Sequence, residues 1–328
     1  MRIFVTGGTG LIGVRLVRAL RKRGDEVVVL SRRSDAWQRV GRDVEIVAGD
    51  PTVAGPWQEQ VGACDAVVNL AGAGIFDRRW NAEYKALIRD SRVRSTQTVA
   101  AALARQPARA DGSPKVLVNG SAIGFYGVHG DEELDESSPM GDDFMAKVCA
   151  EWEAAARPAE AAGVRVALIR TGIVLDRRGG ALKQLWTPFK LGAGGPVGSG
   201  RQFMSWIHHA DEVGILLLAL DHADAKGSIN ATAPQPVTSK AFAKALGRAL
   251  SRPAFLPTPA FGLRLLLGEA ATVVTTGQRV LPRRAAALGY QFRYPDIDSA
   301  LRQIVREERA SRDIRQQLEQ RRPADRLA

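Results

Sequence analysis

The chain opens with the stretch Thr6-Gly7-Gly8-Thr9-Gly10-Leu11-Ile12-Gly13, in which glycines recur at every third position from Gly7. An apolar run over residues 3–5 precedes it, and a helical pattern over 11–20 follows it. In a strand–turn–helix unit, Gly7 would allow a tight turn, Gly10 would let a pyrophosphate approach the backbone, and Gly13 would let the helix pack closely on the strand. The helix N-terminus would offer free N–H groups to the phosphate. The stretch predicts a dinucleotide-binding turn; a glycine-rich turn without a ligand is the alternative.

Short apolar runs separated by helical patterns continue over the first 175 residues. The runs are continuous rather than alternating, which is typical of parallel strands that are covered on both faces. Strands are expected at 3–5, 26–30, 44–47, 66–70, 116–119 and 164–169, and helices at 11–20, 81–104 and 144–161. The order of these elements predicts an α/β protein with a Rossmann-type doubly wound parallel sheet.

The composition changes after residue 175. Residues 176–204 are rich in glycine, and later prolines flank a helical pattern over 238–250. These features predict a smaller, mainly helical C-terminal lobe. We expect residues 1–175 and 205–235 to form a nucleotide-binding Rossmann domain, 176–204 and 236–300 to form a substrate lobe, and 301–328 to form a C-terminal helix or tail.

The end of the second predicted strand indicates which dinucleotide is bound. NAD sites usually place an acid there to hold the ribose 2′-hydroxyl, but this sequence reads Ser31-Arg32-Arg33. A guanidinium with a neighbouring hydroxyl suits a 2′-phosphate, so we expect NADP(H); a pair of surface arginines is the alternative. Asp50, after the third strand, could reach an adenine edge. Small residues over 69–72, Gly72 among them, would let the backbone lie beside the cofactor after the fourth strand.

The net charge of +11 raises the question of a nucleic-acid partner. No aromatic residues interleave with the basic ones, and the C-terminal arginines alternate with acids, so we expect no nucleic-acid partner. The excess charge would instead help to attract a phosphorylated cofactor or substrate. No run approaches the roughly 18 apolar residues of a membrane span, and we expect no membrane partner. The two cysteines and the absence of a signal-peptide pattern favour a cytoplasmic location. No metal-ligand spacing is present, and the oligomeric state is left open.

With these residues in place, the chain resembles the short-chain dehydrogenase/reductase superfamily in its extended branch. It is most similar to the atypical subgroup usually labelled epimerase family protein, which carries its own C-terminal domain. The matching motifs are Val68-Asn69-Leu70-Ala71-Gly72, Arg79-Trp80-Asn81, Ser91-Arg92, 121–127, 148–153, 170–175, 205–208, 230–234, 281–284 and 289–294. The resemblance implies an oxidoreductase or epimerase-like activity on a small-molecule substrate, with nucleotide-linked compounds among the candidates.

The resemblance also implies which residues contact the cofactor. Arg92 would be a second phosphate contact, with a solvated helix arginine as the alternative, and Ile173 would lie near the nicotinamide. The remaining contacts would be made by Gly7, Gly10, Leu11, Ile12, Gly13, Ser31, Arg32, Leu70 and Ala71.

The usual catalytic pair of the superfamily is missing. Catalytic members use a tyrosine with a lysine four residues later, which lowers the pKa of the phenol toward the working range. None of the four tyrosines has a lysine at that spacing. Phe144 occupies the tyrosine position and Val148 the lysine position. Because phenylalanine cannot exchange a proton, we expect the standard mechanism to be absent.

Three other residues are the catalytic candidates. Ser121 lies at the end of the fifth predicted strand, where the superfamily keeps a hydroxyl for a substrate carbonyl or alcohol. Tyr126 and Lys147 could form a replacement acid/base pair; the alternative is that Tyr126 packs in a loop and Lys147 lies on a helix surface. Two functions stay open: an NADP(H)-dependent oxidoreductase or epimerase-like enzyme, and a non-catalytic NADP(H)-binding regulatory protein.

Overall fold

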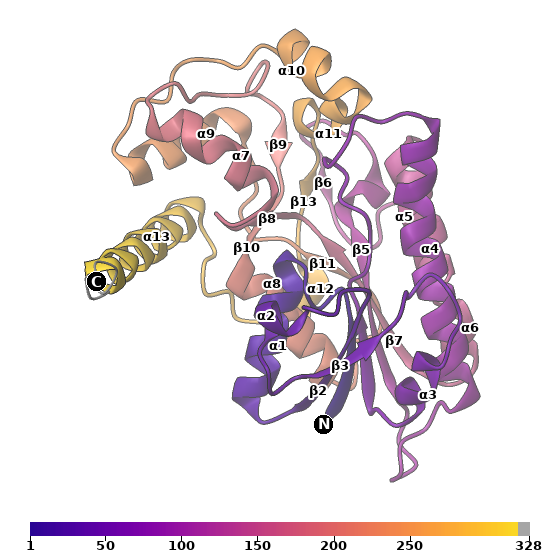
Figure 1. Cartoon of the computed structure of the whole chain (residues 1–328). Helices are drawn as coiled ribbons and strands as arrows, with labels where there is room; N and C mark the ends of the chain where they lie inside the picture. The colour runs from indigo at the N-terminus through magenta and orange to yellow at the C-terminus, as the bar shows by residue number, and fades with distance from the viewer. Residues whose placement is uncertain (321–328) are drawn as a thin grey trace.

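A parallel sheet of seven strands lies at the centre of the structure, a computed structural model that describes residues 1–320 (Figure 1). The strand order is β11-β7-β5-β4-β1-β2-β3, and all neighbouring strands are parallel. The strands are β1 (Arg2–Thr6), β2 (Glu26–Ser31), β3 (Glu45–Ala48), β4 (Ala66–Asn69), β5 (Val116–Ala122), β7 (Arg165–Thr171) and β11 (Gly227–Ala231). The chain runs from β1 outward to β3 and returns to β4 on the other side, so the order reverses between β1 and β4. This arrangement confirms the predicted Rossmann-type doubly wound sheet.

Helices cover both faces of this sheet. On one face lie α1 (Leu11–Arg23) and α8 (His209–Asp221), and on the other lie α3 (Trp57–Gly62), α4 (Ala82–Arg105) and α6 (Arg157–Ala161). Along β1, Ile3 and Val5 pack with the first pair of helices, while Phe4 packs with the second group. Because both faces of a central strand are buried, its sequence is apolar throughout rather than alternating.

The single helix predicted over residues 144–161 is wrong, because this segment forms α5 (Phe144–Ala154) and α6. Pro158 lies in the first turn of α6. Proline has no backbone N–H, and its ring clashes with the carbonyl one turn earlier, so α5 cannot continue through it. At the start of a new helix proline is tolerated, since the first N–H groups have no helical partner.

Two strands run further than their apolar residues suggest. The predicted strands end at residues 119 and 169, whereas β5 continues to Ala122 and β7 to Thr171. In these extensions Ser121 is the direct cross-strand neighbour of Arg170. Both side chains are buried, which is possible because each has hydrogen-bond partners.

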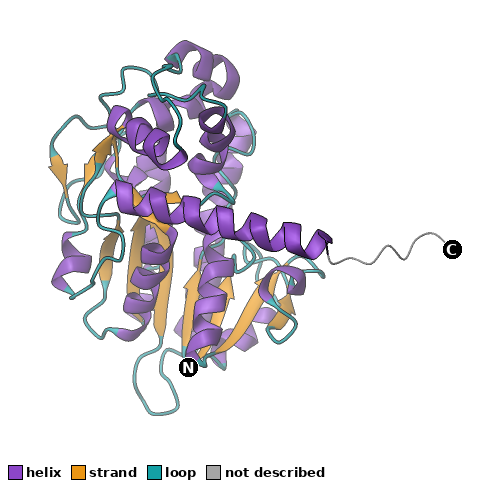
Figure 2. Ribbon diagram, turned by 90° about the vertical axis from the view of Figure 1, so that its left-hand side faces the viewer, coloured by secondary structure: helices purple, strands orange, loops and turns teal. Residues whose placement is uncertain are grey.

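A smaller, mainly helical lobe lies beyond the carboxyl ends of the strands, as Figure 1 and Figure 2 show. Its apolar core is formed chiefly by α7 (Gly180–Lys190), α9 (Ser239–Leu250) and the C-terminal helix α13 (Ile297–Gln320), through Trp186, Phe242 and Leu301 among others. The lobe contains α7 (Gly180–Lys190), β9 (Phe203–Met204), β12 (Val237–Thr238), α9 (Ser239–Leu250), α10 (Ala260–Leu267), η2 (Gly268–Ala271) and α11 (Thr272–Thr275). In the described part of the chain, no helix has both the length and the apolar character needed to cross a bilayer.

The remaining elements are short. They are α2 (Trp37–Val40), η1 (Ile123–Tyr126), β6 (Glu133–Leu134), β8 (Ile173–Leu175), β10 (Trp206–His208), β13 (Arg279–Val280) and α12 (Arg283–Ala287). The chain returns to the main sheet through α8 and β11, and α12 packs beside β11 through the buried Ala285. The boundary expected at residue 301 falls inside α13. The division into domains stays a prediction, and residues 321–328 of the expected tail lie outside the described residues.

Candidate functional site

The glycine turn after β1 lies directly against the end of β4. Gly7 has a positive φ of 66°, and a Cβ atom at this position would lie 2.5 Å from the carbonyl oxygen of Leu70. A Cβ atom at Gly13 would lie 2.2 Å from the carbonyl oxygen of Gly7. Neither position has room for a side chain. The glycines therefore bring the turn, the start of α1 and the backbone of Leu70 and Ala71 together at the point where the strand order reverses.

The start of α1 has the properties of a phosphate site. Its N-cap, Gly10, provides no side-chain cap, and the first turn contains no acidic residue. The N–H groups at the first positions of a helix, here Leu11, Ile12 and Gly13, have no helical partner. They carry the positive end of the helix dipole, which favours an anion. A dinucleotide pyrophosphate fits this arrangement.

The end of β2 presents one available guanidinium. The side chain of Arg32 is 74% exposed, and its Nη1 lies 3.6 Å from Oδ2 of Asp50. Arg33 instead makes two hydrogen bonds of 2.8 Å to Asp35, and Ser31 accepts a hydrogen bond from the backbone N–H of Arg33. The structure therefore brings Arg32 and Asp50 together and leaves Arg32 as the arginine that can contact a phosphate.

Asp50 is itself held as a carboxylate. Burial opposes its ionisation, but hydrogen bonds from the backbone and side chain of Thr52, together with nearby Arg32, lower the pKa of Asp50 below its ordinary value. The ion pair with Arg32 is exposed and weak, so a phosphate can compete for the guanidinium.

Four buried polar side chains lie beneath the site, and the sequence analysis gave none of these side chains a role. Thr6 donates a hydrogen bond of 2.5 Å to Oδ1 of Asn69, and Nδ2 of Asn69 donates to Oγ1 of Thr96 (2.9 Å) and Oδ1 of Asn119 (2.7 Å). All four are fully buried. They join β1, β4, β5 and α4 and so stabilise the edge of the sheet where the cofactor is expected. The signal in the sequence was a polar residue within or at the end of each apolar strand.

Arg92 lies on α4 next to the end of β4. Its Nη1 donates to the carbonyl of Ile88, its guanidinium lies 5.2 Å from the ring centre of Trp152, and it packs against Gly72. Burial lowers the pKa of Arg92. Among the side chains that the structure describes, no carboxylate forms an ion pair with it. A half-buried cation without a counter-charge can be stabilised by an anionic ligand, so the predicted phosphate contact remains a proposal that this geometry supports.

Ser121 and Tyr126 belong to one buried hydrogen-bond network, which we call the Glu153–Arg170 network. Ser121 donates to Oε1 of Glu153 (2.7 Å), and Arg170 makes two hydrogen bonds to Glu153 (2.8 and 2.9 Å). Arg170 also donates to the hydroxyl of Tyr126 (3.0 Å), which donates in turn to Oδ1 of Asn230 (2.7 Å). The structure therefore brings Ser121 and Tyr126 together through a buried ion pair that the sequence analysis missed.

Lys147 does not join this network. It is exposed on α5, and no hydrogen bond between described residues links it to Tyr126. The hydroxyl of Tyr126 is fully buried; burial is the main cause that raises its pKa, although Arg170 opposes the shift. A buried phenol with a raised pKa stays protonated at neutral pH. The proposed replacement pair is thus not assembled, and the catalytic roles of Tyr126 and Lys147 stay predictions.

The two positions that lack the usual catalytic pair face another helix. Phe144 and Val148 cluster with Tyr84 and Ile88 of α4. Phe144 also makes an edge-to-face contact with Trp80, with 5.3 Å between ring centres. Apolar side chains at these positions therefore contribute to the contact between α4 and α5.

The start of the lobe contacts the glycine turn. A Cβ atom at Gly179 would lie 2.9 Å from Leu11, at the first position of α1. Between β7 and this loop, β8 begins at Ile173, whose N–H donates to the carbonyl of Ser205 (2.8 Å). Ile173 is half-buried at the carboxyl end of the sheet. This position is compatible with the predicted contact to the nicotinamide, which stays a proposal.

Glu212 is a buried acid that the sequence analysis also missed. It lies on α8 and is fully buried, and its Oε1 accepts a hydrogen bond of 2.9 Å from Thr171 at the end of β7. Its other oxygen, Oε2, has no hydrogen-bond partner among the described residues. Burial raises the pKa of Glu212 to about 8. In the sequence it resembles any solvated helix acid, so no signal identified it.

Comparison with known proteins identifies the protein family to which these features point. The NAD dependent epimerase/dehydratase family matches residues 3–231, and a domain of unknown function, DUF1731, matches residues 258–304. The epimerase family protein SDR39U1 homolog, chloroplastic, of Arabidopsis thaliana is 44% identical over 305 residues, which cover 93% of this chain and 87% of that protein.

Solved structures agree with this assignment. The crystal structure of human epimerase family protein SDR39U1 (isoform 2) with NADPH matches at a TM-score of 0.81 and 37% identity, covering 93% of this chain and 99% of that one. The Thermus thermophilus UDP-glucose 4-epimerase complex with NAD matches at a TM-score of 0.74 and 19% identity, covering 95% and 100%, and shows the fold alone. The resemblance inferred from the motifs is confirmed, including the separate C-terminal domain. The chain belongs to the NAD-dependent epimerase/dehydratase family.

Proposed function

We propose that the chain is an NADP(H)-dependent oxidoreductase or epimerase-like enzyme. The observation that carries this proposal is the end of β2, where Ser31 and Arg32 stand in place of the acid of an NAD site and Arg32 is exposed. A guanidinium can bind a 2′-phosphate with paired hydrogen bonds, which an acid would repel. The human relative that was crystallised with NADPH supports the same cofactor.

The residues around the glycine turn would hold this cofactor. The N-terminus of α1 would bind the pyrophosphate, Arg32 the 2′-phosphate, and Arg92 a further phosphate oxygen, while Ile173 would lie near the nicotinamide. When bound, NADP(H) supplies or accepts a hydride. The substrate would be a small molecule, nucleotide-linked compounds included. A cytoplasmic location stays a prediction.

A second candidate is a non-catalytic NADP(H)-binding regulatory protein. The observation that favours it is the Glu153–Arg170 network, because Ser121 and Tyr126 make their hydrogen bonds inside it. With Phe144 and Val148 packed against α4, the usual proton donor is also absent. Both candidates need the same cofactor site, so cofactor binding and chemistry require separate tests.

Titration with NADPH and NADH tests the cofactor. We expect NADPH to bind more tightly, and Arg32→Ala to reduce this preference by about 10- to 100-fold, since a charged hydrogen bond contributes about 1.5–3 kcal/mol. Arg33→Ala is the matched control, because Arg33 already pairs with Asp35, and it should leave the preference unchanged. Equal affinities of the unmodified protein for NADPH and NADH would disprove the assignment.

Single-turnover absorbance of bound NADPH across a panel of carbonyl compounds and nucleotide sugars separates the two candidates. Oxidation with any of them supports the enzyme, and Ser121→Ala should then slow the chemical step. If turnover survives Tyr126→Phe and Lys147→Ala, these two residues are not the acid/base pair. No oxidation with any compound, with NADPH affinity unaffected by Ser121→Ala, would favour the regulatory protein.

A further inference from the structure

The positive charge of the chain is concentrated in the lobe. Residues 177–204 and 236–268 contain ten Lys and Arg residues and no Asp or Glu, although the net charge of the whole chain is +11. The rest of the sequence is therefore almost neutral. We call the exposed side chains of these two segments the basic lobe surface. Three of its arginines pair with acids of neighbouring segments, Arg177 with Glu308, Arg178 with Asp176 and Arg248 with Asp298. The remaining lysines and arginines attract anions over a distance of about 8–10 Å at physiological salt.

The most exposed apolar side chains lie on the same surface. Leu191, Phe255, Phe261 and Leu265 are 78, 72, 76 and 77% exposed, and no other large hydrophobic side chain among the described residues is more than 62% exposed. Phe261 and Leu265 are one turn apart on α10, and no described side chain of α10 is buried. Exposed apolar side chains grouped in one region of a surface commonly mark an interaction site.

Hydrogen bonds to backbone carbonyls hold these positions in one continuous region. Leu256 N–H donates to the carbonyl of Gly194, Thr258 N–H donates to that of Pro196, and the guanidinium of Arg252 donates to that of Lys190. The loops over residues 190–198 and 252–258 thus run side by side, and the second leads directly into α10. Figure 1 shows α10 and this loop at the end of the molecule opposite the N-terminus.

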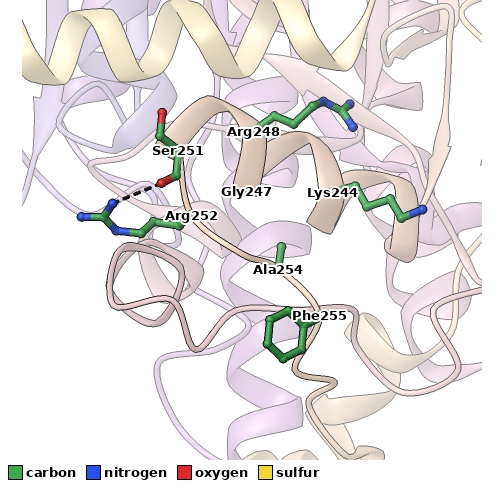
Figure 3. Close-up of a pocket in the computed structure, with 7 residues that line it drawn as sticks. All are labelled: Lys244, Gly247, Arg248, Ser251, Arg252, Ala254 and Phe255. Carbon is green, nitrogen blue, oxygen red and sulfur yellow. Dashed lines mark hydrogen bonds between the residues drawn. The ribbon is translucent and has the colours of Figure 1, made fainter.

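A shallow groove adjoins these loops and combines the same two kinds of side chain. It has a volume of about 520 Å³, with Lys244, Arg248 and Arg252 beside Phe255 and Ala254 (Figure 3). Arg248 pairs with Asp298, whereas Lys244 forms no ion pair with any described residue. A basic group next to an exposed aromatic ring suits a ligand that is both anionic and apolar.

We propose that the basic lobe surface docks the protein on membranes that contain anionic lipids, with Phe261 and Leu265 of α10 inserted at the level of the headgroups. Lipids offer phosphate to the lysines and arginines and acyl chains to the apolar side chains. Nucleic acids or acidic proteins would match the positive charge but would leave the side chains of Phe261 and Leu265 in water. The eight residues of α10 lie at the interface rather than cross the bilayer. This inference goes beyond the proposed function, since a docked protein can serve as enzyme or regulator. It also departs from the expectation of no membrane partner, which rested on the lack of a spanning run and did not consider docking on a membrane surface.

Sedimentation with vesicles tests the proposal on the full chain. We expect binding to mixed phosphatidylglycerol/phosphatidylcholine vesicles, no binding to phosphatidylcholine alone, and release at high salt. The double variants Phe261→Ser/Leu265→Ser and Lys240→Gln/Lys244→Gln should each weaken binding about tenfold. The controls, Val53→Ser and Lys22→Gln/Lys226→Gln, alter exposed residues outside the lobe and should bind as the unmodified chain does.

Three results would overturn this proposal. The first is a lack of binding to phosphatidylglycerol vesicles at low salt, and the second is binding that the controls weaken as much as the lobe variants do. The third is binding to heparin that Lys240→Gln/Lys244→Gln abolishes and Phe261→Ser/Leu265→Ser leaves intact, without binding to vesicles. That result would identify a site for a soluble polyanion. Because all substituted side chains are exposed, each variant should retain the fold, which its NADPH affinity checks.

Discussion

At the scale of single residues, Glu153 and Arg170 form a buried ion pair. Both are buried, and Arg170 gives Glu153 two hydrogen bonds while contacting Tyr126. Burial alone would lower the pKa of Arg170, but the hydrogen bonds and charge of Glu153 raise it above its ordinary value. Each member provides hydrogen bonds that the other needs in the interior, so the loss of one member leaves the other uncompensated.

Glu153→Gln tests this dependence. It keeps the shape of the side chain but removes the charge, and we expect the free energy of unfolding in urea to fall by about 3 kcal/mol or more. Asp298→Asn is the matched control, because Asp298 pairs with Arg248 at the surface and should contribute less than about 1 kcal/mol. A similar change in both variants would show that the buried Glu153–Arg170 pair contributes no more to the free energy of unfolding than the exposed pair does.

At the scale of elements, α5 depends on its N-terminal cap. The carboxylate of Asp143 accepts a hydrogen bond of 2.8 Å from the backbone N–H of Ala146, which would otherwise have no partner in the first turn. The helix has only eleven residues, and α6 begins soon after it at Arg157, so the first turn makes up a large part of α5. The orientation of α5 in turn sets Glu153 against β5 and β7.

Asp143→Ala should therefore destabilise the protein by about 1 kcal/mol, the usual contribution of an N-cap. Asp142→Ala removes the neighbouring, exposed carboxylate, which does not cap the helix, and should change stability little. Urea unfolding of both variants measures the difference. If the two changes are equal, the effect comes from net charge rather than from the cap.

At the scale of the whole molecule, two buried groups give stability opposite dependences on pH. Burial lowers the pKa of His208 to about 3, so the folded state excludes a proton that the unfolded chain binds below about 6.5, and stability falls as pH falls through this range. Glu212 keeps its proton up to about pH 8, whereas its ordinary pKa is 4.5. Its contribution is full below pH 4.5 and is lost as pH rises toward 8. Above pH 6.5 only the Glu212 effect remains of these two.

The free energy of unfolding should thus decrease between pH 6.5 and 8, by at most about 1.4 kcal/mol per pH unit from this single proton. Glu212→Gln removes the titrating group, so we expect a flatter profile in urea unfolding over this range. Glu26→Gln, at an exposed position, should keep the profile of the unmodified chain. An unchanged slope in Glu212→Gln would show that Glu212 ionises normally in the folded protein.

The sequence alone determined the sheet class and the turn that begins the molecule, because glycine spacing and continuous apolar runs act over a few neighbouring residues. It also determined that no acid follows β2, which favours NADP(H). The helical pattern over residues 144–161 did not separate α5 from α6. The local signal for that division is Pro158, which lies in the first turn of α6.

Only the tertiary structure decided how the other polar residues act. Ser121, Glu153 and Arg170 are far apart in sequence, and Glu212 resembles any helix acid until α8 packs on the sheet. A charge or a hydroxyl acquires its properties from burial and from partners that distant strands provide. Those properties arise when the sheet and its helices close around the side chain, and local sequence does not encode them.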